Sequence, residues 1–269
     1  MAIAALNSAA TGLRALSTRI DVVANNLANA ETTAFKSSRC NFEDLTYVVL
    51  RQPGARNAQD QISPAGIQVG SGVAISNTAI NLQEGPLENT GNDLDVAVEG
   101  AGFFRVQMPP SIGNGEGFTR NGQLFINEDG DLVVGSRDGF LIEPTINIDT
   151  NYETITIAND GTVSVKLPDQ TEQQVAGRIQ LNRFPNPKGL LNLGSSVYIE
   201  TDASGPPNEL NPTEDGAGTI RQGFLEASNV DPVKELVTMI KTQRAFELNS
   251  QSIQTADQAL QTIANLRRA

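Results

Sequence analysis

The sequence predicts an α+β protein. An all-β middle domain, an irregular sandwich or barrel, is expected between two long terminal helices that form a coiled-coil-like assembly core. Residues 70–230 carry 22 acidic and 8 basic side chains, whereas the rest of the 269-residue chain carries 9 acidic and 11 basic ones. Of the 24 glycines and 13 prolines, 21 and 10 also lie within 70–230. Because glycine and proline favour turns and weaken helix interiors, the chain combines a turn-rich acidic middle with helix-forming ends.

The N-terminal segment predicts one helix from about Ile3 to Asn29. Leucine or isoleucine recurs every seven residues with further apolar residues between, which is the pattern of a helix that packs along one stripe. The stripe consists of Leu6, Leu13, Leu16, Ile20, Val23 and Leu27. Because Arg14, Arg19 and Asp21 interrupt the apolar residues, we expect neither a secretory signal peptide nor a membrane span here.

The C-terminal segment predicts a second helix, which begins after Asp231 and runs to about Leu266. Asp231 is a favourable N-cap, Pro232 suits the first helical position, and no glycine or further proline follows. The apolar stripe of this helix consists of Leu236, Met239, Ile240, Phe246, Ile253, Leu260 and Ile263. Such a stripe needs another surface, because an isolated amphipathic helix gains little stability in water.

Two interpretations of the terminal helices remain open. Either they pack against each other as an intramolecular hairpin, or they complete their packing with helices of other subunits. A hairpin alone leaves apolar surface uncovered, because both stripes have wide flanks of small residues. A head-to-tail contact between subunits that does not close into a ring builds a helical filament.

The acidic middle predicts many short strands separated by turns. Runs of β-type residues, such as Leu132–Val134 and Thr162–Val165, alternate with Asn-Asp and Asp-Gly pairs. The segment Ile155–Val165 predicts a hairpin about Asp160-Gly161, because alternating apolar residues flank an Asp-Gly turn.

The amino-acid composition excludes several kinds of catalytic site. With no histidine and one cysteine, Cys40, the chain cannot build a Ser-His-Asp or Cys-His nucleophile, an internal disulfide or a Cys₄ site. Gly100-Ala101-Gly102 resembles the start of a phosphate-binding loop, but a strand follows it, so we expect a tight turn or a close backbone approach. The acidic residues around Asp129 lack the calcium-loop pattern. We therefore expect no enzyme, cofactor or metal, and the net charge of −12 argues against nucleic acid as a partner.

Several sequence blocks resemble the bacterial flagellar rod and hook family, and together they cover essentially the whole chain. Near the N-terminus these are Ala24–Asn29 and Thr33–Lys36, with Ala34 where the family usually has glycine. The later blocks follow in the family's order: Val98–Phe104, Phe118–Gly122, Gln222–Val230, Gln243–Glu247 and Ala256–Gln258.

The resemblance implies a structural subunit of a hollow helical tube, which runs from the flagellar basal body through the periplasm as a drive shaft and as a conduit for exported subunits. Tyr47–Ala55 is similar to a segment typical of distal-rod members, whereas hook proteins lack it and are usually longer. A proximal rod or hook-type axial subunit is the alternative within the family. The implied partners are copies of the chain itself, other rod and hook proteins, the surrounding basal-body ring proteins and the type III export apparatus, without direct membrane insertion.

The sequence predicts three parts: a terminal helical core domain (1–30 and 231–269), a connecting and rod-stiffening segment (31–69), and a β-rich outer domain (70–230). By resemblance, the helices line the inside of the tube and the β domain lies outside. The residues expected to brace neighbouring subunits are Tyr47, Leu50, Arg51, Gln52, Pro53 and Gly54. The alternative for this segment is an ordinary domain linker.

Asn25, Asn26 and Asn29 have two interpretations. Asparagine is unfavourable inside a helix, so the group can simply mark the helix end. The resemblance instead favours amide hydrogen bonds across subunits. Two other classes of protein also remain as alternatives: a secreted β-rich adhesin or binding module with helical trimerising ends, and an acidic secreted hydrolase such as a glycosidase.

Overall fold

A computed structural model describes residues 2–54, 64–135, 139–149, 151–168, 172–214 and 216–266. The chain divides into two compact units. Unit 1 contains Met1–Ala28, Ser38–Ile80 and Asp231–Ala269, and unit 2 contains Asn29–Ser37 and Asn81–Val230. Two terminal helices and a mostly β middle confirm the predicted α+β class, and the described strands form no closed barrel.

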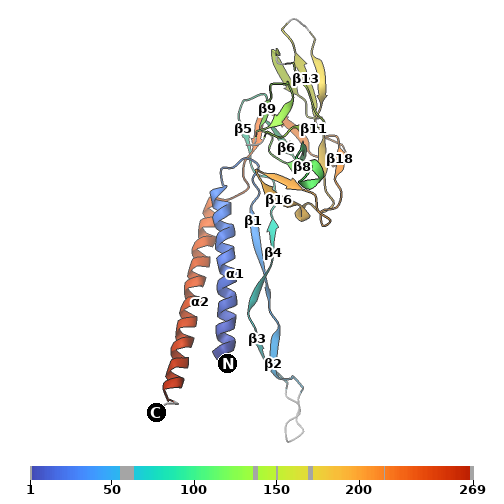
Figure 1. The fold of residues 1–269 in the computed structure, drawn as a ribbon. Coiled ribbons are helices and arrows are strands. Elements are labelled where there is room, and N and C mark those ends of the chain that lie inside the picture. The colour runs from blue at the N-terminus through green and yellow to red at the C-terminus, as the bar shows by residue number, and fades with distance from the viewer. Residues whose placement is uncertain are drawn as a thin grey trace. The chain divides into compact units, whose positions relative to one another are not determined.

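Unit 1 contains both long helices, α1 (Ala2–Ala28) and α2 (Pro232–Leu266), which lie side by side (Figure 1). The predicted start of α2 is confirmed, because the Asp231 carboxylate accepts hydrogen bonds from the backbone N–H groups of Val233 (3.1 Å) and Lys234 (3.2 Å). The helices approach closely near Gly12, where a Cβ atom would lie 3.0 Å from the Asn249 amide nitrogen.

The other part of unit 1 is a long two-stranded ribbon (Figure 1). Its strands are β1 (Ser38–Asp44) paired with β4 (Val73–Ile80), and β2 (Tyr47–Arg51) paired with β3 (Ile67–Gly70), all antiparallel. The ribbon contacts α1 at Gly72, whose φ of +124° favours glycine and where a Cβ atom would lie 2.1 Å from the Thr11 hydroxyl oxygen. The structure therefore groups 38–80 with the helices, whereas the sequence predicted a part boundary between 69 and 70.

Unit 2 is built from short antiparallel strands. A five-stranded sheet has the order β11-β7-β8-β17-β16, a three-stranded sheet has the order β12-β13-β14, and the pairs are β9–β10, β15–β18, β6–β19 and β5–β20. The bounds are β5 (Leu87–Asn89), β6 (Val96–Glu99), β7 (Phe104–Gln107), β8 (Glu116–Thr119), β9 (Leu124–Ile126), β10 (Leu132–Val134), β11 (Ile142–Glu143), β12 (Thr154–Ile157), β13 (Thr162–Lys166), β14 (Gln174–Arg178), β15 (Leu181–Arg183), β16 (Leu191–Gly194), β17 (Val197–Ile199), β18 (Asn208–Leu210), β19 (Thr219–Gln222) and β20 (Phe224–Glu226). Two short 3₁₀ turns, Gly113–Gly115 and Pro187–Gly189, join strands.

Local sequence signals explain several of these elements. The predicted hairpin is confirmed, since β12 and β13 pair antiparallel about Gly161, whose φ is +83°. Gly100 confirms the expected close backbone approach, because a Cβ atom there would lie 2.8 Å from the Gly218 Cα atom. Ala34 occupies a left-handed turn with φ +57°, which gives a physical reason for the glycine that the family usually has there.

The core of unit 2 is apolar and continuous across its small sheets. Buried aliphatic side chains come from the strand pairs, the three-stranded sheet and the five-stranded sheet, including Val98, Val163 and Val106. An aromatic group adds Phe118 edge-on to Phe184, with ring centroids 4.7 Å apart, and Phe103 edge-on to Tyr198. Unit 2 therefore has its own core. Among the residues that the structure describes, no helix is both long and apolar enough to cross a membrane.

Candidate assembly surfaces

The predicted stripe of α1 is largely covered within unit 1. Val23 is buried, and the remaining stripe residues are half-buried: Leu6, Leu13, Leu16, Ile20 and Leu27. Ala15 is also buried, and the glycine at position 12 lets α2 approach closely. The first interpretation of the helices, that they pack against each other, is therefore part of the answer.

The predicted stripe of α2 is only partly covered. Met239, Ile253 and Leu260 are half-buried, whereas Leu236 and Ile240 are 46% and 51% exposed. Phe246 is 36% exposed. The side chain of Ile263 lies outside the described part of the chain.

Further exposed apolar residues, which the predicted stripe did not include, lie beside it: Val233, Val237 and Leu248. Residues 233, 236, 237 and 240 follow a spacing of three and four, so they form one apolar row along the first two turns of α2. We call these four residues the α2 row. The signal was present in the sequence, because Val233 and Val237 extend the stripe at helical spacing.

A second exposed apolar surface lies on the ribbon. Tyr47, Val48, Val49 and Leu50 of β2 are each between 48% and 59% exposed. Because successive residues of a strand point to opposite faces, both faces of the β2–β3 ribbon are apolar. The facing strand adds Ile67 and Val69, which are also exposed. This surface contains Tyr47 and Leu50 of the predicted stiffening segment.

The rest of the predicted stiffening segment lies where β2 ends. Arg51 closes the strand, and its guanidinium donates to the Ala65 carbonyl oxygen at 3.3 Å. Gln52, Pro53 and Gly54 are exposed, and Gly54 has φ +82°. Whether these residues brace a neighbouring subunit stays a prediction.

The three asparagines near the end of α1 differ in their surroundings. Asn26 is buried, its amide nitrogen donates to the Ser38 carbonyl at 2.8 Å, and its amide oxygen accepts from the Ser38 N–H at 2.9 Å. Its amide thus joins α1 to the start of β1 inside the chain, which differs from the expected bonds across subunits. Asn25 is exposed, and the Asn29 side chain accepts a hydrogen bond from the Thr32 hydroxyl at 3.1 Å.

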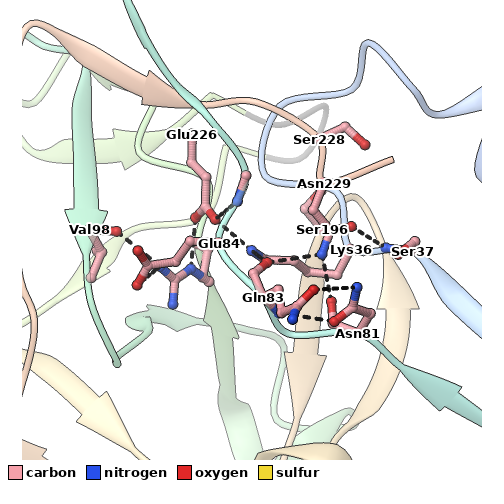
Figure 2. A network of polar contacts seen from close by, with 12 residues as sticks. Lys36, Ser37, Asn81, Gln83, Glu84, Val98, Ser196, Glu226, Ser228 and Asn229 are labelled. Atoms are coloured by element: carbon pink, nitrogen blue, oxygen red, sulfur yellow. Dashed lines mark hydrogen bonds and ion pairs between the residues drawn. The ribbon is translucent and has the colours of Figure 1, made fainter. Parts of the chain in front are cut away.

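Unit 2 contains a buried polar cluster that the sequence analysis did not assign. The Glu226 carboxylate accepts from the Lys36 ammonium at 2.5 Å and from the Arg120 guanidinium at 2.7 Å. All three side chains are at most 4% exposed. Figure 2 shows Lys36 and Glu226 pointing toward each other from opposite ends of the unit's sequence. Each of these residues lies in one of the sequence blocks that resemble the rod and hook family. Because the paired residues are 106 and 190 positions apart, no spacing pattern in the sequence predicts the pairing.

The charges of this cluster shift one another's protonation. Burial alone would raise the pKa of the Glu226 carboxyl, but Arg120 and Lys36 outweigh it, so that pKa lies below its ordinary value. Burial lowers the pKa of the Lys36 ammonium, and the attraction of Glu226 opposes that change. Glu226 is therefore a carboxylate that the fold keeps ionised beside two cations.

The described residues offer little to support catalysis. No group of three or more Cys, Asp or Glu side chains among them is placed to hold a metal ion. An open groove of about 780 Å³ in unit 2, bordered by Met108, Phe140 and Leu193, has no titratable side chain among its described lining residues. The α2 row and the β2–β3 ribbon stand out instead, because their large apolar side chains remain exposed to water.

Comparison with known proteins adds an independent observation. Three family descriptions match the chain: "Flagella basal body rod protein" over residues 6–36, "Flagellar hook protein FlgE/F/G D1 domain" over 97–165, and "Flagellar basal body rod FlgEFG protein C-terminal" over 221–266. The chain is 44% identical to the flagellar basal-body rod protein FlgG of Buchnera aphidicola subsp. Baizongia pistaciae over 264 residues, 98% of this chain and 100% of the relative. It is 40% identical to the protein of the same name from Caulobacter vibrioides over 265 residues, 98% of this chain and 99% of the relative.

Proposed function

The chain belongs to the bacterial flagellar basal-body rod and hook family, and on that premise we propose that it is a structural subunit of the distal rod. Relatives named as rod proteins match nearly its full length, so it is a component of the basal-body rod. The alternatives of a secreted adhesin or a hydrolase are set aside.

The observation that carries the assembly proposal is the apolar surface that unit 1 leaves uncovered. The α2 row and the two-faced β2–β3 ribbon expose large aliphatic and aromatic side chains on elements that have no further partner among the described residues. Burying apolar surface stabilises association by roughly 25 cal/mol for each Å² removed from water. In a homopolymer, other copies of the same chain bury these surfaces.

We infer that these contacts repeat head to tail and build a hollow helical tube. In that tube the terminal helices form the inner layer, the acidic unit 2 forms the outer layer, and the ribbon braces neighbouring subunits and stiffens the rod. The same family membership supports contacts with other rod and hook proteins at the ends of the tube, with the surrounding ring proteins, and with the type III export apparatus that delivers the unfolded chain. The tube then acts as drive shaft and export conduit.

Two variants test the role of the α2 row. Ile240→Asp places a charge in the row, and burying it in a subunit contact would be strongly unfavourable. Val175→Asp is the control, because Val175 is 68% exposed and lies on β14 of unit 2. We expect Ile240→Asp to abolish rods in electron micrographs and motility in cells, and Val175→Asp to leave both unchanged.

Deleting 232–269 tests the same proposal more coarsely. The deletion should abolish assembly and leave the strands of unit 2 folded, as judged by circular dichroism and light scattering. Tubes formed by the deleted chain, or by Ile240→Asp, would contradict the assignment of α2 to the subunit contact.

A further inference from the structure

The chain passes between its two units four times. The crossings follow residues 28, 37, 80 and 230. Each crossing has one end in unit 2, and these ends belong to three segments: 29–37, the start of 81–86, and the end of 226–230. Three separate segments can open independently of one another, unless they are bonded to one another.

Asn229 bonds these segments together within unit 2 (Figure 2). Its amide oxygen accepts from the Ser37 N–H at 2.8 Å, and its amide nitrogen donates to the carbonyls of Asn81 (2.8 Å) and Gln83 (2.9 Å). Backbone bonds run in parallel, from the Asn81 N–H to the Ser37 carbonyl (2.8 Å) and from the Asn229 N–H to the Phe35 carbonyl (3.3 Å). One side chain therefore contacts all three segments.

The buried charges bond the same three segments a second time. Lys36 donates to the Gln83 carbonyl at 2.8 Å as well as to Glu226. Glu226 also accepts from the Gly85 N–H at 3.0 Å, and its own carbonyl accepts from the Ala34 N–H at 2.8 Å. Each segment is thus held by both Asn229 and the Lys36–Glu226 pair.

Arg120 joins this bonded group to the core of unit 2. Its guanidinium donates to the carbonyls of Val98 (2.9 Å) and Gly100 (3.0 Å) while its Nε binds Glu226. Val98 belongs to β6 and is fully buried in the apolar core. The charges are screened little at this depth, so their geometry is held more tightly than that of a surface pair.

We propose that Asn229, Lys36, Glu226 and Arg120 form a clamp that makes the three segments one rigid root within unit 2, so that the segments cannot open independently of one another. The three segments of the root open only together, and Arg120 couples them to the core of unit 2. The clamp itself is a property of the single chain.

Hydrogen–deuterium exchange of the full chain in solution tests the clamp, without requiring polymerisation. Asn229→Ala removes three hydrogen bonds and no charge. We expect at least about tenfold faster exchange at the amides of Ala34, Ser37 and Asn81, with the amides of β13 unchanged. Asn186→Ala is the matched control, because the Asn186 amide bonds only the Ala203 carbonyl among its described contacts, and the root amides should exchange there as in the wild type.

Two results would overturn the proposal. Faster exchange confined to Ser37, which alone loses its acceptor, would show that the segments open independently. An equal rise in exchange at the root and at β13 would show a general loss of stability instead of a clamp. If Asn229→Ala does not fold, hydrogen–deuterium exchange of the wild type is measured at low urea concentrations instead. Exchange rates of the root amides that share one dependence on urea support the clamp, and separate dependences refute it.

Discussion

Replacing Glu226 by glutamine should be among the most destabilising single changes in unit 2. The substitution keeps the shape of the side chain and removes its charge. It leaves the ammonium of Lys36 and the guanidinium of Arg120 buried, with Glu84 as the nearest remaining carboxylate to Arg120, at 3.9 Å and 44% exposed. Removing one partner of a buried ion pair typically costs about 3–5 kcal/mol, because the other charge stays desolvated. We expect a loss of that size in the free energy of unfolding.

A double-mutant cycle separates the pairing from general damage. Lys36→Met also costs several kcal/mol, because Glu226 and the Gln83 carbonyl lose a donor. The combined variant Lys36→Met/Glu226→Gln removes one charge of each sign and leaves Arg120 beside Glu84. Its loss should be smaller than the sum of the two single losses by about 1–3 kcal/mol. The control is Glu153→Gln, which breaks an exposed pair with Lys166 and should cost at most about 1 kcal/mol.

The assay is urea unfolding followed by circular dichroism, at neutral pH and in acid. Because the folded pKa of Glu226 lies below the unfolded one, its contribution is present above the unfolded pKa and is lost as the pH falls through the folded value. The wild type should therefore lose more stability in acid than Glu226→Gln does. Strictly additive single losses, or a Glu226→Gln cost no larger than that of Glu153→Gln, would refute the reasoning.

Two further predictions concern single positions. Burial raises the pKa of Tyr198 to about 12. Wild-type stability should therefore fall by about 2 kcal/mol as the pH rises from 10 to 12, and Tyr198→Phe should lack that loss in alkaline urea titrations. Gly72→Ala should lower the free energy of unfolding by about 2–4 kcal/mol, because the new Cβ atom meets Thr11 at a positive φ. The control Gly91→Ala, at φ +69° with open space around it, should cost only about 1 kcal/mol of backbone strain. Equal thermal unfolding midpoints of the two variants would contradict the clash.

Local signals account for the elements that the sequence predicted. The cap at Asp231 and the glycine-free segment after it define α2, and the Asp-Gly turn defines the β12–β13 hairpin. Each depends on neighbours a few residues apart, which a sequence displays directly. Ala34 shows the same relation, since a departure from glycine marks a backbone position with positive φ.

The remaining features depend on contacts between distant residues. The pairing of β1 with β4, in which Ser38 lies opposite Ile80, brings 73–80 into unit 1, and these two strands are far apart in the sequence. The partner of Lys36 lies 190 residues away, and a buried lysine looks like any surface lysine in the sequence. The apolar stripe of α2 was visible, but only the packing of α1 decides that Met239 is half covered while Ile240 stays exposed.

The exposed β2–β3 ribbon also governs how the free chain behaves in solution. Two apolar strands whose outer edges pair with no other described strand are a template for uncontrolled association. The net charge of −12 opposes that association by keeping separate copies apart, and this repulsion reaches about 10 Å at 0.1 M salt but only about 3 Å at 1 M. Salt concentration, without any change of fold, therefore sets whether the purified chain stays dispersed, and dilute buffer is the condition in which single copies persist.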